Sequence, residues 1–223
     1  MTKLAFAAAF VAALAVWHPS SAQDLDPLNL YGPRIEFDIL RNGDRIGGTA
    51  VAFRRDGDLV SAVTDTNLTV KVLFVTVLTL THHAEETWRA GQLVSLSAVT
   101  RANGAERKVT AVRTGDVLTV SIDGAETTTN PNLLLADDWD MRILATREVL
   151  DPLGGRMIRI ASNDRGAEQV ATKAGMRAAL RYALTGERTA EIWYDDRGRW
   201  VRSRVKGRDG SYADYVCQVC GGP

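Results

Sequence analysis

The longest apolar run beyond the N-terminal region extends from Val70 to Leu80 and continues in alternation to Trp88. It is rich in β-branched residues, whose stiff side chains suit a pleated strand better than a helix. An extended segment that is apolar on both faces must be covered twice, or must line an apolar cavity on one side. We therefore expect a sheet that wraps around this run. One face carries Val70, Val72, Phe74, Leu78 and Leu80, and the other carries Leu73, Val75 and Val77.

Turn signals recur at short, even spacing along the rest of the chain. Asn-Gly and Asp-Gly pairs supply the positive φ values that hairpin turns require, and they occur at residues 42–43, 56–57, 103–104, 123–124 and 209–210. Alternating segments between such signals predict strands joined by hairpins. The predicted strands cover residues 35–41, 45–53, 59–70, 75–88, 93–101, 107–113, 117–122, 157–161, 176–184, 189–194, 200–206 and 212–216.

These strands predict an all-β, antiparallel fold with a short helical segment. A flat sheet of about a dozen strands would leave long exposed edges, so we expect strong curvature into a barrel or half-barrel. A helical insert is expected around residues 131–150, because Asn130-Pro131 can start a helix and Trp139 and Ile143 recur at helical spacing. The insert would either close one end of the barrel or cross between two halves of the sheet.

The N-terminus has the pattern of a secretory signal peptide. Lys3 precedes a continuous apolar stretch over residues 4–16, and small residues end at Ala22. We expect a signal over residues 1–22 with cleavage after Ala22. The stretch is short for a membrane-spanning helix, which needs about 20 residues, although a retained N-terminal anchor is the alternative. Residues 23–223 would then form a single periplasmic or secreted domain, with no transmembrane segment left.

The overall charge is balanced, with 27 basic and 27 acidic residues. Neutral charge and expected export both argue against nucleic acid as a partner. A local basic strip is formed by Arg202, Arg204 and Lys206, which share one face of a predicted strand. This strip is either an ordinary solvated face or a surface that meets anionic lipid headgroups or an envelope protein.

Several short motifs in order carry a family resemblance. They resemble the bacterial secreted family labelled domain of unknown function 6134, over nearly the whole expected mature chain. The strand layout is also similar to periplasmic curved-sheet proteins that include the lipoprotein-localisation carriers. The family resemblance implies no catalytic residue. The motifs are Phe37-Asp38-Ile39-Leu40-Arg41-Asn42-Gly43, Ile46-Gly47, Lys71-Val72-Leu73-Phe74, Glu86-Thr87-Trp88, Ile192-Trp193-Tyr194-Asp195, Gly198-Arg199-Trp200 and Gly207-Arg208-Asp209-Gly210-Ser211.

The residue types that carry chemistry are sparse. Cys217 and Cys220 are a disulfide candidate near the C-terminus, with exposed thiols, a redox pair or zinc binding as alternatives. His82 and Glu86 share a strand face, as a general base with its carboxylate or as an inert pair at the sheet rim. The sequence contains no Gly-x-Ser-x-Gly nucleophile elbow and no glycine-rich phosphate-binding loop. We therefore assign no catalytic residue, no metal and no cofactor.

Two functional classes remain open at this stage. The first is a non-catalytic envelope protein that binds or carries a lipid, isoprenoid or other apolar ligand in its curved sheet. The second is a structural or protein-interaction module with a solid core. An open apolar interior would favour the first class, and a filled one the second. The expected ligand-lining residues are Val72, Phe74, Leu78, Leu80, Trp88, Trp139 and Trp193.

Overall fold

The computed structural model describes residues 26–207 and 209–221, so the expected signal peptide lies outside the described residues. Within the described ranges, the helical elements are α1 (Pro27–Tyr31) and the 3₁₀ helix η1 (Met141–Ala145). No helix among these residues is both long enough and apolar enough to pass through a bilayer. The strands are β1 (Arg34–Arg41), β2 (Asp44–Asp56), β3 (Leu59–Val72), β4 (Val75–Arg89), β5 (Gln92–Ala102), β6 (Ala105–Thr114), β7 (Val117–Ile122), β8 (Ala125–Thr129), β9 (Leu134–Leu135), β10 (Glu148–Asp151), β11 (Arg156–Thr172), β12 (Gly175–Gly186), β13 (Ala190–Tyr194), β14 (Trp200–Lys206) and β15 (Tyr212–Val219).

All strands belong to one sheet of 15 strands in the order β8-β7-β6-β5-β4-β3-β2-β1-β15-β14-β13-β12-β11-β10-β9. Neighbours pair antiparallel, except that β9 and β10 are parallel. The sheet is not closed, because β8 and β9 form its two edges. The predicted all-β, antiparallel, strongly curved half-barrel is therefore confirmed, with more strands than expected.

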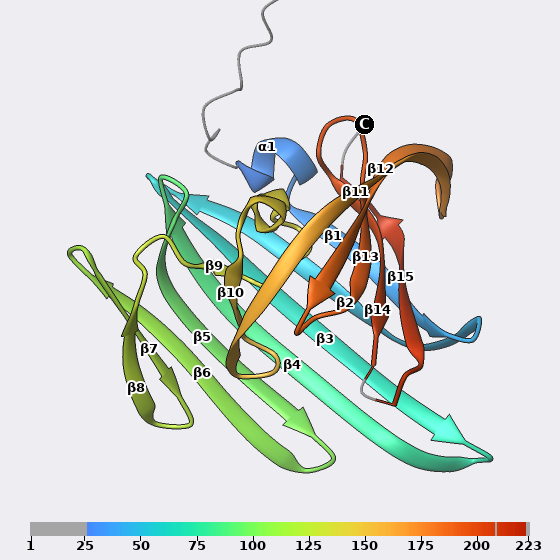
Figure 1. The fold of residues 1–223 in the computed structure, drawn as a ribbon, viewed down its shortest axis with the longest axis horizontal. Helices are drawn as coiled ribbons and strands as arrows, with labels where there is room; N and C mark the ends of the chain where they lie inside the picture. The colour runs from blue at the N-terminus through green and yellow to red at the C-terminus, as the bar shows by residue number, and fades with distance from the viewer. Residues whose placement is uncertain (1–25, 208, 222–223) are drawn as a thin grey trace, which may run out of the picture.

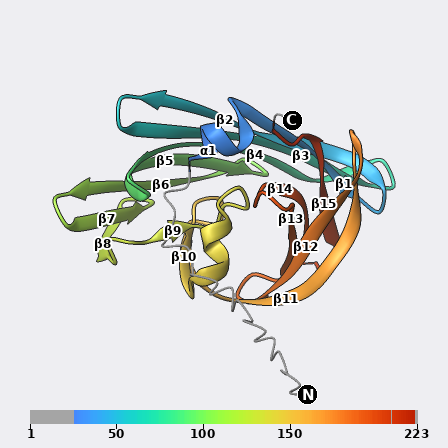
Figure 2. The same cartoon turned by 90° about the horizontal axis from the view of Figure 1, so that it is seen from above.

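The sheet curls over on itself around the pairing of β1 with β15 (Figure 1). Seen from above, β2 to β8 form one gently bent wall, and β11 to β15 bend around to face it (Figure 2). The segment with β9, η1 and β10 lies inside the open side of this curl (Figure 2). The interior between the two walls is the space in which ligand-binding features were expected.

Several hairpin turns follow the Asn-Gly and Asp-Gly signals of the sequence. Asn42, Asn103 and Asp123 each adopt positive φ and each precede a glycine with positive φ. The β3–β4 turn has no such pair: Leu73 (φ 46°) and Phe74 (φ 70°) occupy the two left-handed positions. Left-handed backbone costs about 1–2 kcal/mol for a residue with a Cβ. The apolar run is thus interrupted by a turn, and is not one strand covered on both faces.

A second turn signal, at Asp164-Arg165-Gly166, lies within a strand. Strand β11 continues through it, with a register shift between Asp164 and Ala167 against β12. One strand carries extra residues there, which makes the site a bulge and bends the strand. The predicted strand over residues 157–161 was therefore too short, because a bulge and a turn use the same residue types.

The expected helical insert over residues 131–150 is mostly not helical. Only Met141–Ala145 is helical, as η1, and the Asp140 side chain caps it by accepting the Arg142 backbone N–H at 3.0 Å. On either side of it, β9 and β10 pair in parallel. Leu135 and Leu150 are buried there, so these apolar residues pack as short strands.

An aromatic cluster joins this segment to the wall. The Trp139 ring lies 5.3 Å from Phe53 and 6.2 Å from Trp88, centroid to centroid, with both pairs edge to face. Tyr31 of α1 stacks on Phe53 at 5.6 Å, and its hydroxyl donates to the Trp139 carbonyl oxygen at 2.8 Å. Edge-to-face aromatic pairs add about 0.5–1.5 kcal/mol each beyond burial. These contacts hold the segment inside the curl.

We expect Gly47→Ala to destabilise the fold by about 1–3 kcal/mol through overpacking. A Cβ at Gly47 would lie 2.0 Å from the Asn67 carbonyl oxygen across the β2–β3 ladder. At the neighbouring Gly48, a Cβ would lie 3.1 Å from the Phe37 carbonyl oxygen, so Gly48→Ala should cost less. Urea unfolding of both variants checks the order. A Gly47→Ala protein as stable as the parent would contradict this packing.

Candidate functional site

Polar side chains form a row across the inner face of four adjacent strands. Thr49, Thr66, His82 and Thr100 are successive cross-strand partners on β2, β3, β4 and β5. The Thr49 and Thr66 hydroxyl oxygens lie 2.6 Å apart, and His82 Nδ1 lies 2.8 Å from Thr100 Oγ1. We call these four residues the polar belt. All four are buried, so the belt is an internal feature and not a rim.

The belt is uncharged at neutral pH. Burial lowers the pKa of His82 to about 4, with smaller opposing effects from Asp151 and Asp65. A buried imidazole loses hydration most strongly in its charged form, which explains the direction. The belt therefore offers hydroxyl groups and a neutral ring, each able to donate or accept a hydrogen bond.

On one side of the belt the inner face becomes apolar. Leu68, Leu80 and Ala102 are cross-strand partners in the next row, and Val70 pairs with Leu78 in the row after it. Facing side chains of Val205, Tyr212, Ala213 and Tyr215 from β14 and β15 complete a groove of about 810 Å³. We call this space the apolar groove.

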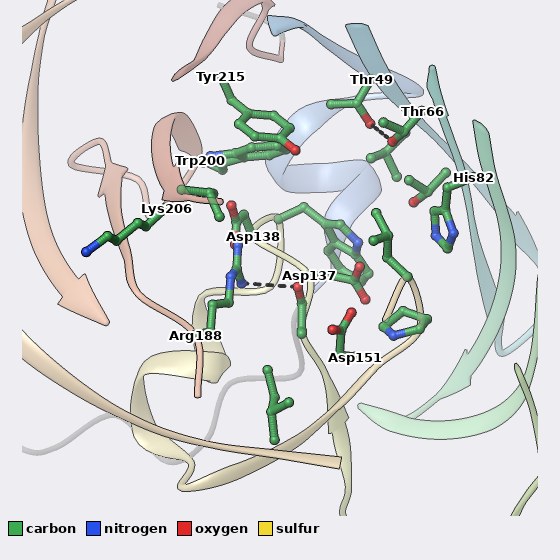
Figure 3. A pocket seen from close by; sticks show the side chains of 18 of the residues that line it. Thr49, Thr66, His82, Asp137, Asp138, Asp151, Arg188, Trp200, Lys206 and Tyr215 are labelled. Carbon is green, nitrogen blue, oxygen red and sulfur yellow. Dashed lines mark hydrogen bonds and ion pairs between the residues drawn. The ribbon is translucent and has the colours of Figure 1, made fainter. Parts of the chain in front are cut away.

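A second space lies beside the belt itself. It measures about 460 Å³ and is lined by Thr49, Thr66 and His82 from one wall and by the 136–139 segment and Arg188 opposite. We call it the polar pocket; Figure 3 shows these side chains pointing into it from both sides. The pocket and the groove adjoin, because Leu153, Val205, Gly207 and Tyr215 line both.

The far side of the polar pocket is held by Asp138. Its Oδ1 accepts from Arg188 at 2.6 Å, and its Oδ2 accepts from the Ser203 hydroxyl at 2.6 Å. Trp200 Nε1 in turn donates to Ser203 Oγ at 2.7 Å, and Tyr194 donates to the Asp138 carbonyl oxygen at 2.9 Å. A buried ion pair is stable only when further hydrogen bonds satisfy its remaining atoms, and this network does so.

The neighbouring acids are less well satisfied. Glu86 is buried on β4 and accepts from Trp88 Nε1 at 2.9 Å, but its Oε1 has no hydrogen-bond partner among the described residues. The same holds for Asp137 Oδ2. Burial raises the pKa of Glu86, and the charge of Asp137 reinforces this shift. Burial also raises the pKa of Asp137 to about 7, and the charge of Asp138 adds to the effect. A proton retained on these carboxyl groups supplies the donor that the orphaned oxygens lack.

Only part of the expected lining lies at these spaces. Leu78 and Leu80 line the apolar groove, and Trp139 lines the polar pocket. Trp88 lines a further cavity of about 600 Å³ near α1, together with Trp139. Val72 and Phe74 lie at the exposed end of the β3–β4 hairpin and contact none of these spaces. The turn at Leu73-Phe74 reverses the chain before these side chains reach the interior.

Trp193 lies on the opposite face of the sheet. Its cross-strand partners are Arg181 and Arg202, whereas Ile192 and Ser203 of the alternate row face the core. The guanidinium of Arg202 lies 5.2 Å from the Trp193 ring centroid. Such stacking buries an indole without a cavity, which explains why a buried tryptophan here does not line the interior.

The basic strip is partly neutralised and does not form one free surface. Arg202 pairs with Asp214 at 2.9 Å, and Arg204 lies 4.6 Å from the centroid of the Tyr212 ring. Lys206 is exposed and lines the mouth of the polar pocket. Its ammonium group points away from the other lining side chains (Figure 3).

The other candidate reactive residues, namely the histidines, Glu86 and the two cysteines, do not form one cluster. His82 bonds to Thr100 and Glu86 to Trp88, and no hydrogen bond joins His82 to Glu86. His83 points outward and bonds Asp65 at 2.7 Å. No group of three or more His, Cys, Asp or Glu residues in the described chain is arranged to hold a metal. Cys217 and Cys220 are joined by a disulfide, and both are buried against the core.

Sequence reasoning missed the residues that shape the polar pocket. Asp137 and Asp138 lie within the expected helical insert over residues 131–150, and Thr49, Thr66 and Thr100 belong to strands distant in sequence. The even spacing of His82, Glu86 and Trp88 on one strand face was the only available signal. The belt becomes visible only through strand register.

The comparisons agree with a curled, unclosed antiparallel sheet of the β-barrel-like class. A crystal structure described as a "beta-barrel-like protein of domain of unknown function DUF1849" from Brucella abortus matches with a TM-score of 0.58. It is 9% identical, and the match covers 82% of this chain and 94% of that one. At this identity the likeness concerns the fold alone. No curated protein matches the chain.

The chain belongs to the family described as Domain of unknown function (DUF6134), whose sequence profile matches residues 37–218. The family resemblance drawn from the short motifs is thereby confirmed. The matched region begins in β1 and ends in β15, so it spans both walls and the whole interior.

We expect Asp137→Asn to make stability less sensitive to rising pH. The folded-state pKa of about 7 lies above the ordinary value of 3.8, so the folded protein binds the proton more tightly and loses stability as pH rises through this window. His82 acts in the opposite direction, but it is common to both proteins. Between pH 5 and pH 8, the free energy of unfolding of the variant should rise by more than about 1 kcal/mol relative to that of the parent.

Urea unfolding at both pH values measures this difference. Glu126→Gln removes an exposed carboxylate on β8 and serves as the control, which should leave the pH dependence of the parent unchanged. Equal pH dependence in the parent and in Asp137→Asn would show that Asp137 is ionised throughout, contrary to its surroundings.

Proposed function

We propose that this protein is an exported cell-envelope protein that binds or carries a hydrophobic ligand without chemical conversion. The ligand is lipid-like or isoprenoid-like, with its chain in the apolar groove and its polar end at the polar belt. One observation carries the proposal: the inner face of β4 changes from Leu78 and Leu80 to His82 at the boundary between groove and pocket. The groove and pocket therefore match an amphipathic molecule.

The size and chemistry of the groove support an apolar chain. Its volume of about 810 Å³ falls within the range of about 300–1,000 Å³ that ligand pockets occupy. Leu68, Val70, Leu78 and Leu80 line one side. Each buried CH₂ group of a ligand chain contributes about 0.8 kcal/mol. A solid core would leave no such space, so this interior favours binding over the purely structural alternative.

The polar pocket supports a polar end that hydrogen-bonds and carries no obligatory charge. The belt residues are neutral at neutral pH, and Arg188 is already paired with Asp138. Thr64 Oγ1 and Trp139 Nε1 border the same pocket and are buried without hydrogen-bond partners among the described residues. Buried polar atoms without partners are rare in folded proteins. A hydroxyl, ester or amide group of a ligand can satisfy them.

The proposed location follows from the N-terminal pattern and the disulfide. A signal over residues 1–22 would direct the chain to the periplasm or outside the cell. Disulfides persist in those compartments and are rare in the cytosol, and Cys217 pairs with Cys220.

We expect Leu80→Glu and Ala102→Phe to weaken ligand binding by at least tenfold, which is about 1.4 kcal/mol. The first places a charge in the groove, and the second fills the space opposite Leu80. Binding is measured by titrating delipidated protein with the fluorescent fatty acid cis-parinaric acid. Native mass spectrometry of protein purified without detergent checks for a carried lipid.

The matched control is Val117→Glu, which adds the same charge at an exposed valine of β7, outside the groove. It should bind as the parent does. Circular dichroism and thermal unfolding confirm that each variant is folded. A parent protein that carries no lipid and ignores the probe would remove the proposal and favour the interaction module.

A further inference from the structure

The end of the β3–β4 hairpin is the most exposed apolar part of the described chain. Residues 71–77, which we call the hairpin tip, include Leu73 at 87% and Phe74 at 99% exposure. Val72, Val75 and Val77 are also exposed. Pairing of β3 with β2 ends at Gly47–Leu68, and pairing of β4 with β5 ends at Leu80–Ala102. The tip therefore projects beyond its neighbours at a corner of the sheet (Figure 1).

The turn at the tip has the wrong residues for its own stability. Leu73 and Phe74 hold the two positive-φ positions that Asn103-Gly104 holds in the β5–β6 turn. Asn-Gly suits this geometry, whereas side chains with a Cβ, and large ones above all, are disfavoured there. Leu73 and Phe74 are exposed at turn positions that disfavour them. This combination indicates that the two side chains contact another molecule.

The charge at the tip has one sign. Lys71 is the only Lys, Arg, Asp or Glu between Asp65 and Glu85. A positive charge next to a cluster of exposed apolar groups is typical of segments that enter the headgroup region of anionic membranes. Acidic residues, which anionic headgroups would repel, are absent from this stretch of the described chain.

The edge of β4 at the tip is already hydrogen-bonded. The Asn103 side-chain oxygen accepts from the Thr79 backbone N–H at 2.8 Å, and its side-chain nitrogen donates to the Val77 carbonyl at 3.3 Å. The Asn103 backbone N–H donates to the Thr79 carbonyl at 2.9 Å. This capping disfavours the addition of a partner strand to β4. It also reduces the number of backbone N–H and C=O groups without hydrogen-bond partners, which are energetically unfavourable in an apolar medium.

We propose that the hairpin tip inserts into the boundary between headgroups and acyl chains of a lipid leaflet, with Leu73 and Phe74 as the inserted side chains and Lys71 at the headgroups. The tip is a narrow projection whose exposed apolar side chains are those of Val72, Leu73, Phe74, Val75 and Val77. A fluid leaflet can surround such a shape, whereas a protein partner would need a deep matching pocket. The capped β4 edge and the lone positive charge favour the leaflet further.

Docking at this point would place the apolar groove against the membrane. Val70, Val77 and Leu78 belong to the same hairpin and line the groove. A chain leaving the leaflet beside the tip would meet an apolar surface at once. The inference about docking does not require the proposed ligand, since the tip can insert whether or not the groove is filled.

The test is binding to sedimented vesicles of phosphatidylcholine with and without phosphatidylglycerol. The full chain is expressed, its N-terminus is determined by mass spectrometry, and the same processed form is used throughout. The key variant is Leu73→Asn/Phe74→Gly, which gives the tip the turn residues of Asn103-Gly104. It should be folded at least as stably as the parent, yet bind vesicles at least tenfold more weakly.

A control variant, Val112→Asn/Met176→Asn, removes two exposed apolar side chains elsewhere and should bind as the parent does. Lys71→Gln should lower affinity about fivefold for vesicles with phosphatidylglycerol and leave phosphatidylcholine binding unchanged. A fluorophore on Thr76→Cys should be quenched by lipids brominated near the headgroup. The same label on Thr127→Cys, in β8, should not be quenched.

Each contrary outcome overturns the proposal. A parent chain that does not bind vesicles, or a Leu73→Asn/Phe74→Gly variant that binds equally well, excludes insertion of the tip. Loss of self-association in this variant, without loss of vesicle binding, would assign the tip to a contact between copies. Titration of the variant with cis-parinaric acid keeps the two proposals separate, because ligand binding in solution should survive the change at the tip.

Discussion

The pairing of β1 with β15 is the interaction on which the rest of the structure depends. These strands lie near opposite ends of the described chain, and Phe37 pairs with Cys217 across them. Their ladder joins two successive meanders, β1 to β8 and β10 to β15, into one sheet. Inside the bend, the Phe37 ring stacks on Trp200 with centroids 3.7 Å apart. Without this junction the two walls would have no common edge, and there would be no interior.

Polar residues in such an interior need partners, and the chain supplies them unevenly. Both carboxylate oxygens of Asp138 accept hydrogen bonds, one from Arg188 and one from the Ser203 hydroxyl. Glu86 and Asp137 are bonded only in part, and burial raises the pKa of both. Burying polar groups without partners is unfavourable. Asp138 is therefore part of a bonded network, whereas Glu86 and Asp137 each keep one carboxyl oxygen without a partner among the described residues.

Much of the fold could be predicted from alternation and turn residues, because the residues that form a hairpin turn are neighbours in the sequence. Asn103-Gly104 and Asp123-Gly124 form the turns that their residue types favour. The prediction failed where tertiary context outweighs local preference. Leu73-Phe74 turns without Gly or Asn, and β11 passes through Asp164-Arg165-Gly166 as a bulge. Neither departure has a local signal.

The candidate site was less accessible from sequence than the fold. Leu78 and Leu80 were found because they belong to one alternating run, and both line the groove. The polar belt depends on the register of four strands, which alternation along one strand does not specify. Trp193 shows the converse, since an arginine on each neighbouring strand buries it on the outer face.

The two unjoined edges of the sheet have a mechanical consequence. Strands β8 and β9 are not bonded to each other, so strand pairing alone does not fix the width of the curl. In a sealed cylinder the diameter is set by strand number and stagger. In this open sheet the width of the curl depends instead on the contacts that the segment with β9, η1 and β10 makes with the wall of β2 to β8, such as those of Trp139 with Phe53 and Trp88.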